Sequence, residues 1–573
     1  MNRLYYGDNL DVLRRYVKDE SVDLIYLDPP FNSNADYNVL YKEQDGSRAA
    51  AQIKAFGDTW RWDKSAAATY QEVVEAGGKV SEAMQALRLL LGDNDVLAYL
   101  TMMAPRLVEL QRVLKSTGSI YLHCDPGASH YLKILMDAVF GPEHFINEIV
   151  WRRTGAHNSN RSFGAIHDTL LFYGKSEEYS FHVLRRPYMK KHVESRYQKA
   201  ADGKMKFSSG GNVLTGAGIT AGDSGKPWRG FNPSAKGRHW AVPGFYDSLM
   251  PETYLKLSST EKLEALYQAN LVEIDGTSAW PIMVRLLGER DGTPVQDMWS
   301  YQPYTEGTVW GTNEGIDSDV AWLGPTDPER LGYPTQKPLG LLERIIAVSS
   351  DDHGVVLDPF CGCGTAIMAA EKNGCQWIGI DITHLAITLM KHRLADAFGK
   401  APVYEVIGEP VSLPDAQALA DSDKYQFEWW ALGLVGARPT DPKKGSDKGI
   451  DGRLYFHDEG DGSKTKQVIF SVKGGHTDVS HVRDLRGVLD REHAELGVLI
   501  TMQQPTQPMR TEAASGGFYH SPGWRRDYPK IQILTIDDLL SGKGIQMPPL
   551  GNVTFKKAPP AVRDRGETED LGI

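Results

Sequence analysis

The chain has 573 residues, of which 41% are hydrophobic, so it is long enough for three or four domains with cores of their own. Its formal net charge of −11 excludes a globally basic surface, and any contact with nucleic acid must therefore come from local patches. The four cysteines lack paired zinc spacing, no leader opens the chain and no apolar run could span a bilayer, which predicts a reduced, cytoplasmic protein without a membrane partner.

The first predicted element that carries chemistry is a strand at residues 22–27. Its apolar residues show no helical period, and the two prolines that follow cannot continue a strand. The resulting motif lies at the carboxyl end of a strand, where ligands bind in open α/β sheets: Asp28, Pro29, Pro30 and Phe31. The Asp28 carboxylate and the Pro29 carbonyl suit methylation of an exocyclic amine, and Phe31 suits stacking on a flipped base. A proline turn with Asp28 as a cap is the alternative from these residues alone.

Helices and strands then alternate along the chain. We expect helices at residues 80–91, 96–114 and 130–140 and strands at residues 119–125, 146–151 and 169–173. Such alternation is typical of a parallel sheet with helices on its faces. His123 lies near the end of a predicted strand, where we favour a hydrogen-bonded structural histidine over a catalytic one.

A basic stretch opens a long insertion. Residues 185–206 contain eight lysines and arginines against two acids, with Tyr188 and Tyr197 interleaved. This combination suits phosphate contact and base stacking, although a run of charge is usually a solvated face. The predicted DNA contacts are Arg185, Arg186, Lys190 and Lys191.

A second combination of strand and turn follows the insertion. Residues 355–358 form a predicted strand, and the glycine turn after it leads into a helix. Glycines let a ligand approach the backbone closely, and a helix N-terminus favours an anionic group. The next strand ends in Asp381, which is placed to hold ribose hydroxyls. No third glycine follows Gly364, which argues against a nicotinamide or flavin cofactor.

Together these motifs resemble the β class of S-adenosylmethionine-dependent DNA amino-methyltransferases, in which the Asp-Pro-Pro-Tyr/Phe motif precedes the cofactor loop. Further segments fit this family: Tyr6-Gly7-Asp8-Asn9, residues 145–151 and 167–173, and Tyr333-Pro334-Thr335-Gln336-Lys337-Pro338. The resemblance implies a doubly wound, Rossmann-like α/β sheet built from residues 1–184 and 326–400. Residues 185–325 are then an inserted target-recognition region.

The resemblance also implies the reaction. The cofactor is S-adenosyl-L-methionine, the substrate is double-stranded DNA, and the methylated atom is adenine N6. Cytosine N4 is the alternative, because the same pair of acceptors serves either amine. The family's cofactor residues correspond to Asp8, Lys337, Asp358, Phe360, Gly362, Gly364, Thr365 and Asp381, with Lys337 at the methionine end. A homodimer is compatible with the family, and a DNA-binding subunit without turnover is the rival from another class.

A smaller α/β domain is expected at residues 425–573, after a linker at residues 401–424. Its predicted order of helix, strand, helix, strand and late strand–helix resembles the Mrr-type restriction endonucleases of the PD-(D/E)xK group. The resemblance implies that Asp451 and Glu428 hold Mg²⁺ and that Lys473 activates water. Ser471 departs from the family, which usually has Glu or Gln at that position. A retired nuclease that only binds DNA or packs on the methyltransferase is the alternative.

Overall fold

The computed structural model divides into two compact units. Unit 1 contains Met1–His182, Gln296–Tyr301 and Asp319–Ile573, and unit 2 contains Val183–Val295 and Gln302–Ser318. The structure describes residues 1–30, 62–156, 162–199, 203–247, 249–288, 291–333, 335–398, 402–440, 449–458, 465–549 and 554. Within these ranges, no helix combines the length and the apolar composition needed to cross a membrane.

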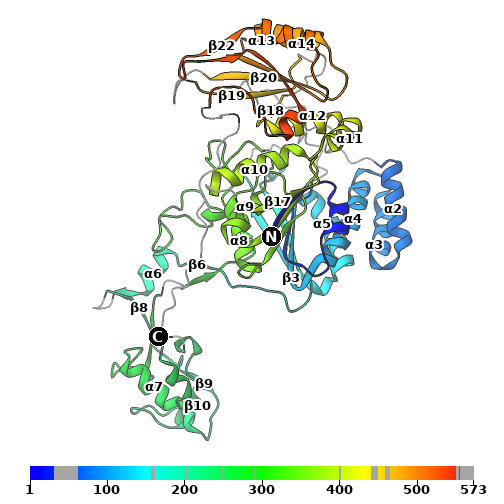
Figure 1. Cartoon of the computed structure of the whole chain (residues 1–573). Helices are drawn as coiled ribbons and strands as arrows, with labels where there is room; N and C mark the ends of the chain where they lie inside the picture. The colour runs from blue at the N-terminus through cyan, green and yellow to red at the C-terminus, as the bar shows by residue number, and fades with distance from the viewer. Residues whose placement is uncertain are drawn as a thin grey trace. The chain divides into compact units, whose positions relative to one another are not determined.

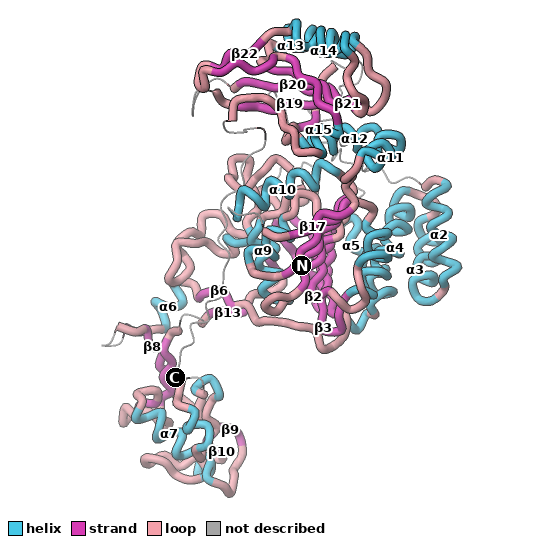
Figure 2. The backbone as a smooth tube through the Cα atoms, viewed as in Figure 1, coloured by secondary structure: helices cyan, strands magenta, loops and turns pink. Residues whose placement is uncertain are grey.

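Unit 1 is built on a nine-stranded sheet, drawn in magenta in Figure 2, with the strand order β14-β4-β5-β3-β2-β15-β16-β1-β17. The strands are β1 Asn2–Tyr6, β2 Val22–Leu27, β3 Leu114–Cys124, β4 Phe145–Arg152, β5 His167–Gly174, β14 Met298–Trp299, β15 Val355–Asp358, β16 Gln376–Asp381 and β17 Tyr404–Ile407. The six strands from β3 to β17 in this order are parallel, whereas β5 is antiparallel to both of its neighbours. The parallel strands are nearly continuous apolar runs because both of their faces are covered.

The two halves of the predicted sheet interleave at its centre. Strand β2 from the N-terminal half pairs in parallel with β15, with Leu24 opposite Val356 and Ile25 opposite Leu357. Parallel strands that pair in this way end at the same edge of the sheet. The Asp-Pro-Pro motif after β2 and the glycine turn after β15 are therefore neighbours, although the chain places them far apart.

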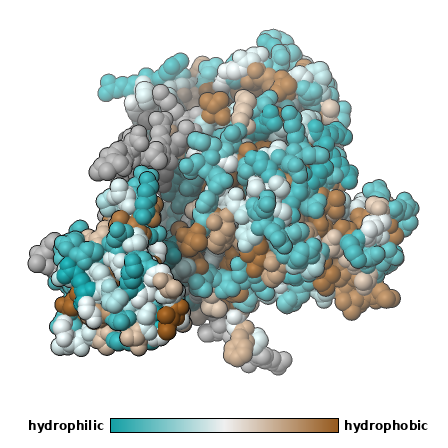
Figure 3. All heavy atoms as spheres, turned by 90° about the horizontal axis from the view of Figure 1, so that it is seen from below, coloured by the Kyte–Doolittle hydropathy of each residue, from teal (hydrophilic) through white to brown (hydrophobic). Residues whose placement is uncertain are grey.

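Helices cover both faces of this sheet (Figure 1). One face carries α1 Asn9–Tyr16, α4 Asp95–Val113 and α5 Pro126–Phe140, with α2 Lys64–Ala76 and α3 Gly78–Leu91 packed outside them. The other face carries α8 Leu339–Ser349, α9 Thr365–Lys372 and α10 His384–Phe398. This arrangement agrees with the predicted mixed α/β class with a large central sheet. Hydrophobic side chains also reach the surface (brown in Figure 3), and Leu89 and Leu90 of α3 are 91% and 71% exposed.

Unit 2 has short strands around an aromatic core. Its elements are β6 Arg185–Pro187, α6 Lys190–Arg196, β7 Gln198–Lys199, β8 Met205–Ser209, β9 Thr215–Ala217, β10 Arg238–Trp240, α7 Ser259–Gln268, β11 Val272–Glu273, β12 Ile282–Leu286 and β13 Gly292–Pro294. Trp228, Trp240, Tyr246 and Tyr254 are buried together in this core. Many aromatics of the insertion therefore serve packing and are not exposed for base stacking.

The C-terminal part of unit 1 contains a second sheet of five strands, in the order β18-β19-β20-β21-β24. Its elements are α11 Leu413–Ser422, α12 Lys424–Leu434, β18 Arg438–Pro439, β19 Gly452–Phe456, β20 Lys466–Lys473, α13 Val479–Glu492, β21 Leu496–Thr501, α14 Gln507–Ser515, β22 Phe518–Ser521, β23 Arg526–Pro529, β24 Ile531–Thr535 and α15 Ile536–Leu540. The predicted α/β character of this region agrees with these elements, and α14 and the β22–β23 hairpin were not expected.

Residues 401–424, which we expect to be a linker, contain two regular elements. Residues Tyr404–Ile407 form β17, which pairs in parallel with β1 as the last strand of the large sheet. Leu413–Ser422 forms α11, whose start is capped by the Ser412 side chain and whose Ala416 is buried in the C-terminal core. Both short elements depend on tertiary packing, which the proline-rich composition of this stretch does not reveal.

Candidate active site

The Asp-Pro-Pro motif follows β2 at the carboxyl edge of the large sheet. The Asp28 side chain is 18% exposed, and its Oδ2 accepts a hydrogen bond of 2.5 Å from Nζ of Lys337. Among the described residues, no hydrogen bond to Oδ1 is present. Pro29 and Pro30 follow at the same edge, whereas Phe31 lies outside the described residues.

Two glycines shape the turn between β15 and α9. Gly362 and Gly364 have φ angles of +49° and +77°, which fall in the left-handed region that favours glycine. A Cβ at Gly364 would also lie 2.7 Å from Cγ of Met390. The turn leads directly into α9, which begins at Thr365 and whose first N–H groups have no partner within the helix. The turn therefore offers a close backbone approach and N–H donors to a ligand.

Two buried acids support this turn from the strand ends. Asp358 ends β15 and accepts a hydrogen bond of 3.1 Å from the Phe360 N–H. Asp381 ends β16 and accepts hydrogen bonds from the Gly362 N–H at 2.9 Å and from the N–H and hydroxyl of Thr383 at 2.8 Å. Burial raises the pKa of both carboxyls, and that of Asp358 well above its usual range. Asp381 thus orders the glycine turn from the place where the sequence predicts ribose contact.

Hydrogen bonds of Asp8 and Asn9 fix the end of β1 at the carboxyl edge of the large sheet. Asp8 caps α1 by accepting from the Leu10 N–H at 2.9 Å, and its other oxygen accepts from Arg106 at 2.7 Å. The Asn9 amide donates to the carbonyl of Pro359 at 2.9 Å. Asp8 therefore has a clear positioning role, Asn9 belongs to the same predicted motif, and Arg106 is a residue that the sequence motifs did not identify.

A buried arginine on α10 holds the glycine turn from behind. Arg393 is 4% exposed, and its Nη1 donates to the Cys363 carbonyl and to the Thr365 hydroxyl, both at 3.0 Å. The Thr365 hydroxyl in turn lies 3.4 Å from the Lys337 carbonyl. The chain of contacts from Arg393 therefore reaches Lys337 and, through its Nζ, Asp28. An arginine among the apolar residues of a helix is the sequence signal that could have identified it.

Glu329 fixes the segment that carries Lys337. One Glu329 oxygen accepts from the Leu339 N–H at 2.8 Å, and its carbonyl accepts from the Gln336 side chain at 2.8 Å. Arg393 lies 3.7 Å from the same carboxylate. Burial raises the pKa of Glu329. The segment that carries Lys337 is thus attached to the glycine turn through Arg393 and to Asp28 through Lys337.

His123 lies behind the Asp-Pro-Pro motif and has partners at both ring nitrogens. Nδ1 is 2.8 Å from the Tyr26 hydroxyl, and Nε2 is 3.2 Å from Oδ2 of Asp168. The ring is fully buried, which confirms the expected structural histidine. Although burial opposes it, the hydrogen bond from His123 and the nearby charges of Lys337 and Arg153 lower the pKa of Asp168.

The residues that were predicted for the nuclease-like site do come together. Asp451 Oδ2 accepts from the Val472 N–H at 2.6 Å and from Ser471 and Lys473 at 3.2 Å each. Burial and the charge of Asp451 raise the pKa of Glu428 to about 7. Among the described side chains, no group of three or more His, Cys, Asp or Glu could hold a metal ion. Within this cluster Asp451 forms an ion pair with Lys473, and Mg²⁺ binding stays a prediction.

The predicted DNA contacts lie at the start of unit 2 and differ in their partners. Arg185 donates to the Gly292 carbonyl at 3.0 Å, and Arg186 lies 3.3 Å from the buried Asp317. Lys190 and Lys191 begin α6 and are exposed. No carboxylate in the described part of the chain pairs with either lysine. These two lysines are thus the better placed of the four for phosphate contact.

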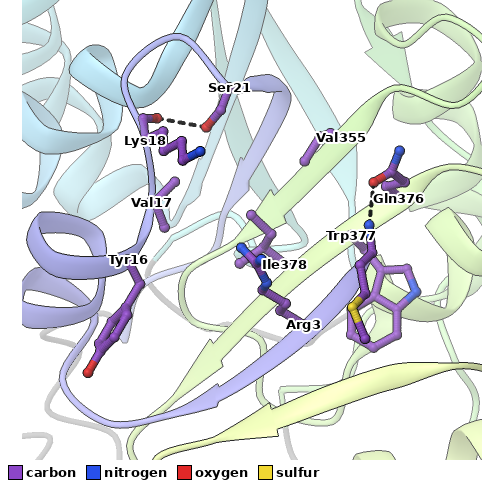
Figure 4. A pocket seen from close by; sticks show the side chains of 10 residues that line it. Arg3, Tyr16, Val17, Lys18, Ser21, Val355, Gln376, Trp377 and Ile378 are labelled. Carbon is purple, nitrogen blue, oxygen red and sulfur yellow. Dashed lines mark hydrogen bonds between the residues drawn. The ribbon is translucent and has the colours of Figure 1, made fainter.

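A cavity of about 220 Å³ lies at the opposite edge of the sheet (Figure 4). It is lined where β1, β15 and β16 begin, by residues that include Arg3, Lys18 and Trp377. None of the described motif residues lines it, so it is not the site that the motifs predict. All four cysteines are free and buried.

Comparisons with known proteins agree with these two regions. A family described as DNA methylase, covering N6 and N4 methyltransferases, matches residues 22–392, well over half of the chain. A family described as NACHT-associated inactive Restriction Endonuclease 1 matches residues 424–541.

Individual relatives match over similar lengths. The type II methyltransferase M.EcaI from Enterobacter cloacae is 28% identical over 433 residues, which cover 75% of this chain and 76% of the relative. The Mod subunit of the type III restriction-modification enzyme StyLTI from Salmonella typhimurium is 26% identical over 74% of this chain, which spans only 58% of that subunit. A DNA modification methylase from Thermus thermophilus, solved in complex with S-adenosyl-L-methionine, aligns with a TM-score of 0.31 at 15% identity, over 71% of this chain and all of that chain.

Proposed function

The chain belongs to the DNA methylase family of N6 and N4 methyltransferases, and we propose that it methylates adenine N6 in double-stranded DNA with S-adenosyl-L-methionine as the methyl donor. The observation that carries the proposal is the position of Asp28, directly beside the glycine turn at one sheet edge. Asp rather than Ser at this position favours adenine by resemblance, and cytosine N4 is the alternative. The intact Asp28, both glycines and Asp381 speak against a subunit that has lost turnover.

The chain's own residues can do two things to a target amine. The nitrogen is a poor nucleophile because its lone pair is delocalised into the base. Oδ1 of Asp28 and the carbonyl of Pro29 are two acceptors for its two N–H bonds, and they would favour a tetrahedral nitrogen. Lys337 holds Oδ2 and keeps the carboxylate oriented. Phe31 is proposed to stack on the flipped base.

The turn fits the proposed cofactor. Its backbone donors and left-handed glycines allow close approach of the carboxylate-bearing end, and Asp381 lies where the ribose hydroxyls are expected. Asp8, Asp358, Phe360, Gly362, Gly364 and Thr365 complete the proposed set, with Asp358 hydrogen-bonded within the turn and Asp8 at the start of α1. When bound, S-adenosyl-L-methionine supplies an activated methyl group on its sulfonium.

The test uses the full chain and a duplex substrate. Asp28→Ala should bind S-adenosyl-L-methionine as the wild type does but transfer no methyl group to DNA. Asp11→Ala, on the surface of α1, is the matched control and should retain activity. Mass spectrometry of the digested product identifies the modified base. Full activity of Asp28→Ala would overturn the proposal, and N4-methylcytosine would overturn only the choice of amine.

For the C-terminal domain we propose DNA binding without cleavage. The match to a family described as inactive supports this choice, as does Ser471 at the position where the nuclease family usually has Glu or Gln. Mg²⁺-dependent restriction is the alternative prediction. If wild-type protein nicks unmethylated DNA with Mg²⁺ or Mn²⁺ and Asp451→Ala or Lys473→Ala abolishes the nicking, the alternative is correct.

Two further expectations stay proposals. A homodimer would bury the apolar surface that Leu89 and Leu90 expose on α3, and sedimentation of Leu89→Ser beside the wild type would detect it. A reduced, cytoplasmic setting is proposed from the four free cysteines, and a fluorescent fusion viewed in the producing cells tests it.

A further inference from the structure

The C-terminal domain carries a β-hairpin that none of the sites above uses. Strands β22 and β23 pair in antiparallel register, from Phe518 opposite Pro529 to Ser521 opposite Arg526. The two strands form a sheet of their own, joined by residues 522–525. Figure 1 shows β22 at the outer edge of this domain. The hairpin is therefore a separate, projecting element of the fold.

A buried polar cluster, the hairpin anchor, fixes this element to the β19–β20 pair: Asp458, Lys466, Tyr519 and Ser521. The Asp458 side chain has no exposed surface, and it accepts from Lys466 at 3.1 Å and from the hydroxyls of Tyr519 and Ser521. A Cβ on Gly523 would collide with the Asp458 carbonyl. Burying a carboxylate is costly unless its partners are complete, as they are here. The anchor therefore holds the hairpin tip in one geometry.

The tip presents an aromatic ring and two cations to solvent. Trp524 is 45% exposed, and Arg525 and Arg526 are exposed beside it. No carboxylate among the described residues forms an ion pair with either arginine. The acid of the hairpin, Asp527, lies 2.7 Å from His520. In a chain of net charge −11, this is a local basic surface with an exposed aromatic side chain next to it.

We infer that the β22–β23 hairpin binds double-stranded DNA. The two arginines fit backbone phosphates, and the neighbouring Trp524 fits the sugar and base surface. A two-stranded ribbon has the dimensions that enter a major groove. The anchor lowers the ordering cost on binding, since the tip is already rigid. The inference deepens the proposed DNA-binding role of the C-terminal domain and does not depend on which base is methylated.

The first test measures DNA affinity of the full chain across a salt series. The double variant Arg525→Ala, Arg526→Ala should weaken duplex binding about tenfold at low salt and reduce the slope of log K against log salt by roughly 1.8, for two lost phosphate contacts. Arg483→Ala, Arg491→Ala removes the same charge from α13 of the same domain and should leave both values near the wild type. Methyl transfer at saturating DNA should not change in either variant.

The second test locates the contact directly. Trp524→Cys introduces an exposed thiol into a chain whose own cysteines are all buried, so a photo-crosslinker can be attached there selectively. The label should crosslink to duplex DNA, whereas the same label on Lys79→Cys of α3 should not. Wild-type affinity of the double arginine variant together with no crosslink overturns the inference. A loss of DNA affinity in the α13 control alone would also overturn the inference, because DNA would then bind another face of the domain.

Discussion

Glu428→Gln should stabilise the C-terminal domain at neutral and alkaline pH. The Glu428 side chain is 13% exposed, and burial together with Asp451 raises its pKa from 4.5 to about 7. At about 1.4 kcal/mol per pH unit, ionising this group in the folded state costs about 3 kcal/mol at pH 8. Glutamine keeps the shape of the side chain and carries no charge, so the variant should gain most of that free energy.

The direction of the pH dependence follows from proton binding. The folded carboxyl keeps its proton up to about pH 7, whereas the unfolded carboxyl releases it near 4.5. The folded state therefore binds more protons between these values, and the stability that the group contributes is full below pH 4.5 and is lost as the pH rises through 7. Glu428→Gln should flatten the stability curve of this domain between pH 5 and pH 8.

The measurement is hydrogen–deuterium exchange of the β20 backbone in the full chain, corrected for intrinsic rates and expressed as an opening free energy at each pH. Strand β20 lies at the centre of the C-terminal sheet and reports on its cooperative opening. Glu82→Gln on exposed α3 serves as the control and should not change the curve. A pH profile of Glu428→Gln that matches the wild type would refute the reasoning.

Three further outcomes follow from the methyltransferase site. Arg393→Met should weaken S-adenosyl-L-methionine binding, measured by calorimetry, by about tenfold to a hundredfold, because the turn loses two hydrogen bonds from a buried charge. Wild-type affinity of this variant would contradict the positioning role of Arg393. Gly364→Ala should lower thermal stability by about 1–3 kcal/mol and reduce cofactor affinity, since its φ of +77° and the contact with Met390 both disfavour a Cβ. The double variant Lys190→Glu, Lys191→Glu should lower DNA affinity and reduce the dependence of that affinity on salt, while the affinity for the cofactor stays unchanged. A fall in cofactor affinity would assign the basic stretch at residues 185–206 to the methyltransferase core.

The parts of the fold that could be predicted from sequence are those that depend on the pattern of a few neighbouring residues. The apolar run of β2 and the prolines after it predict a strand end, and the structure has β2 end at Leu27. The strands predicted at residues 146–151 and 169–173 lie within β4 and β5. The resemblance also places Asp451 and Lys473 in one site, and these two side chains lie 3.2 Å apart. In each case, chemistry and secondary structure are encoded within a few residues.

The contacts that escaped prediction depend on tertiary placement. Nothing in the helix around Arg393 indicates that its guanidinium reaches the Cys363 carbonyl. The resemblance assigned Lys337 to the methionine end, and only the packed structure shows its Nζ against Asp28. Residues 404–407 are too few to predict β17 by themselves, although three of the four favour strands, and the strand forms by pairing with the edge of β1. Long-range pairing supplies information that no window of sequence contains.

The interleaved sheet has a consequence for the order in which the protein can fold during synthesis. Asp28 leaves the ribosome early, but its partner Lys337 follows 309 residues later, and β15 comes after that. Strand β2 therefore has one unpaired edge throughout the synthesis of unit 2. Contacts of such high sequence separation slow folding and expose an unpaired strand in the meantime. We therefore expect chaperones to bind the nascent chain until β15 and β16 have been synthesised.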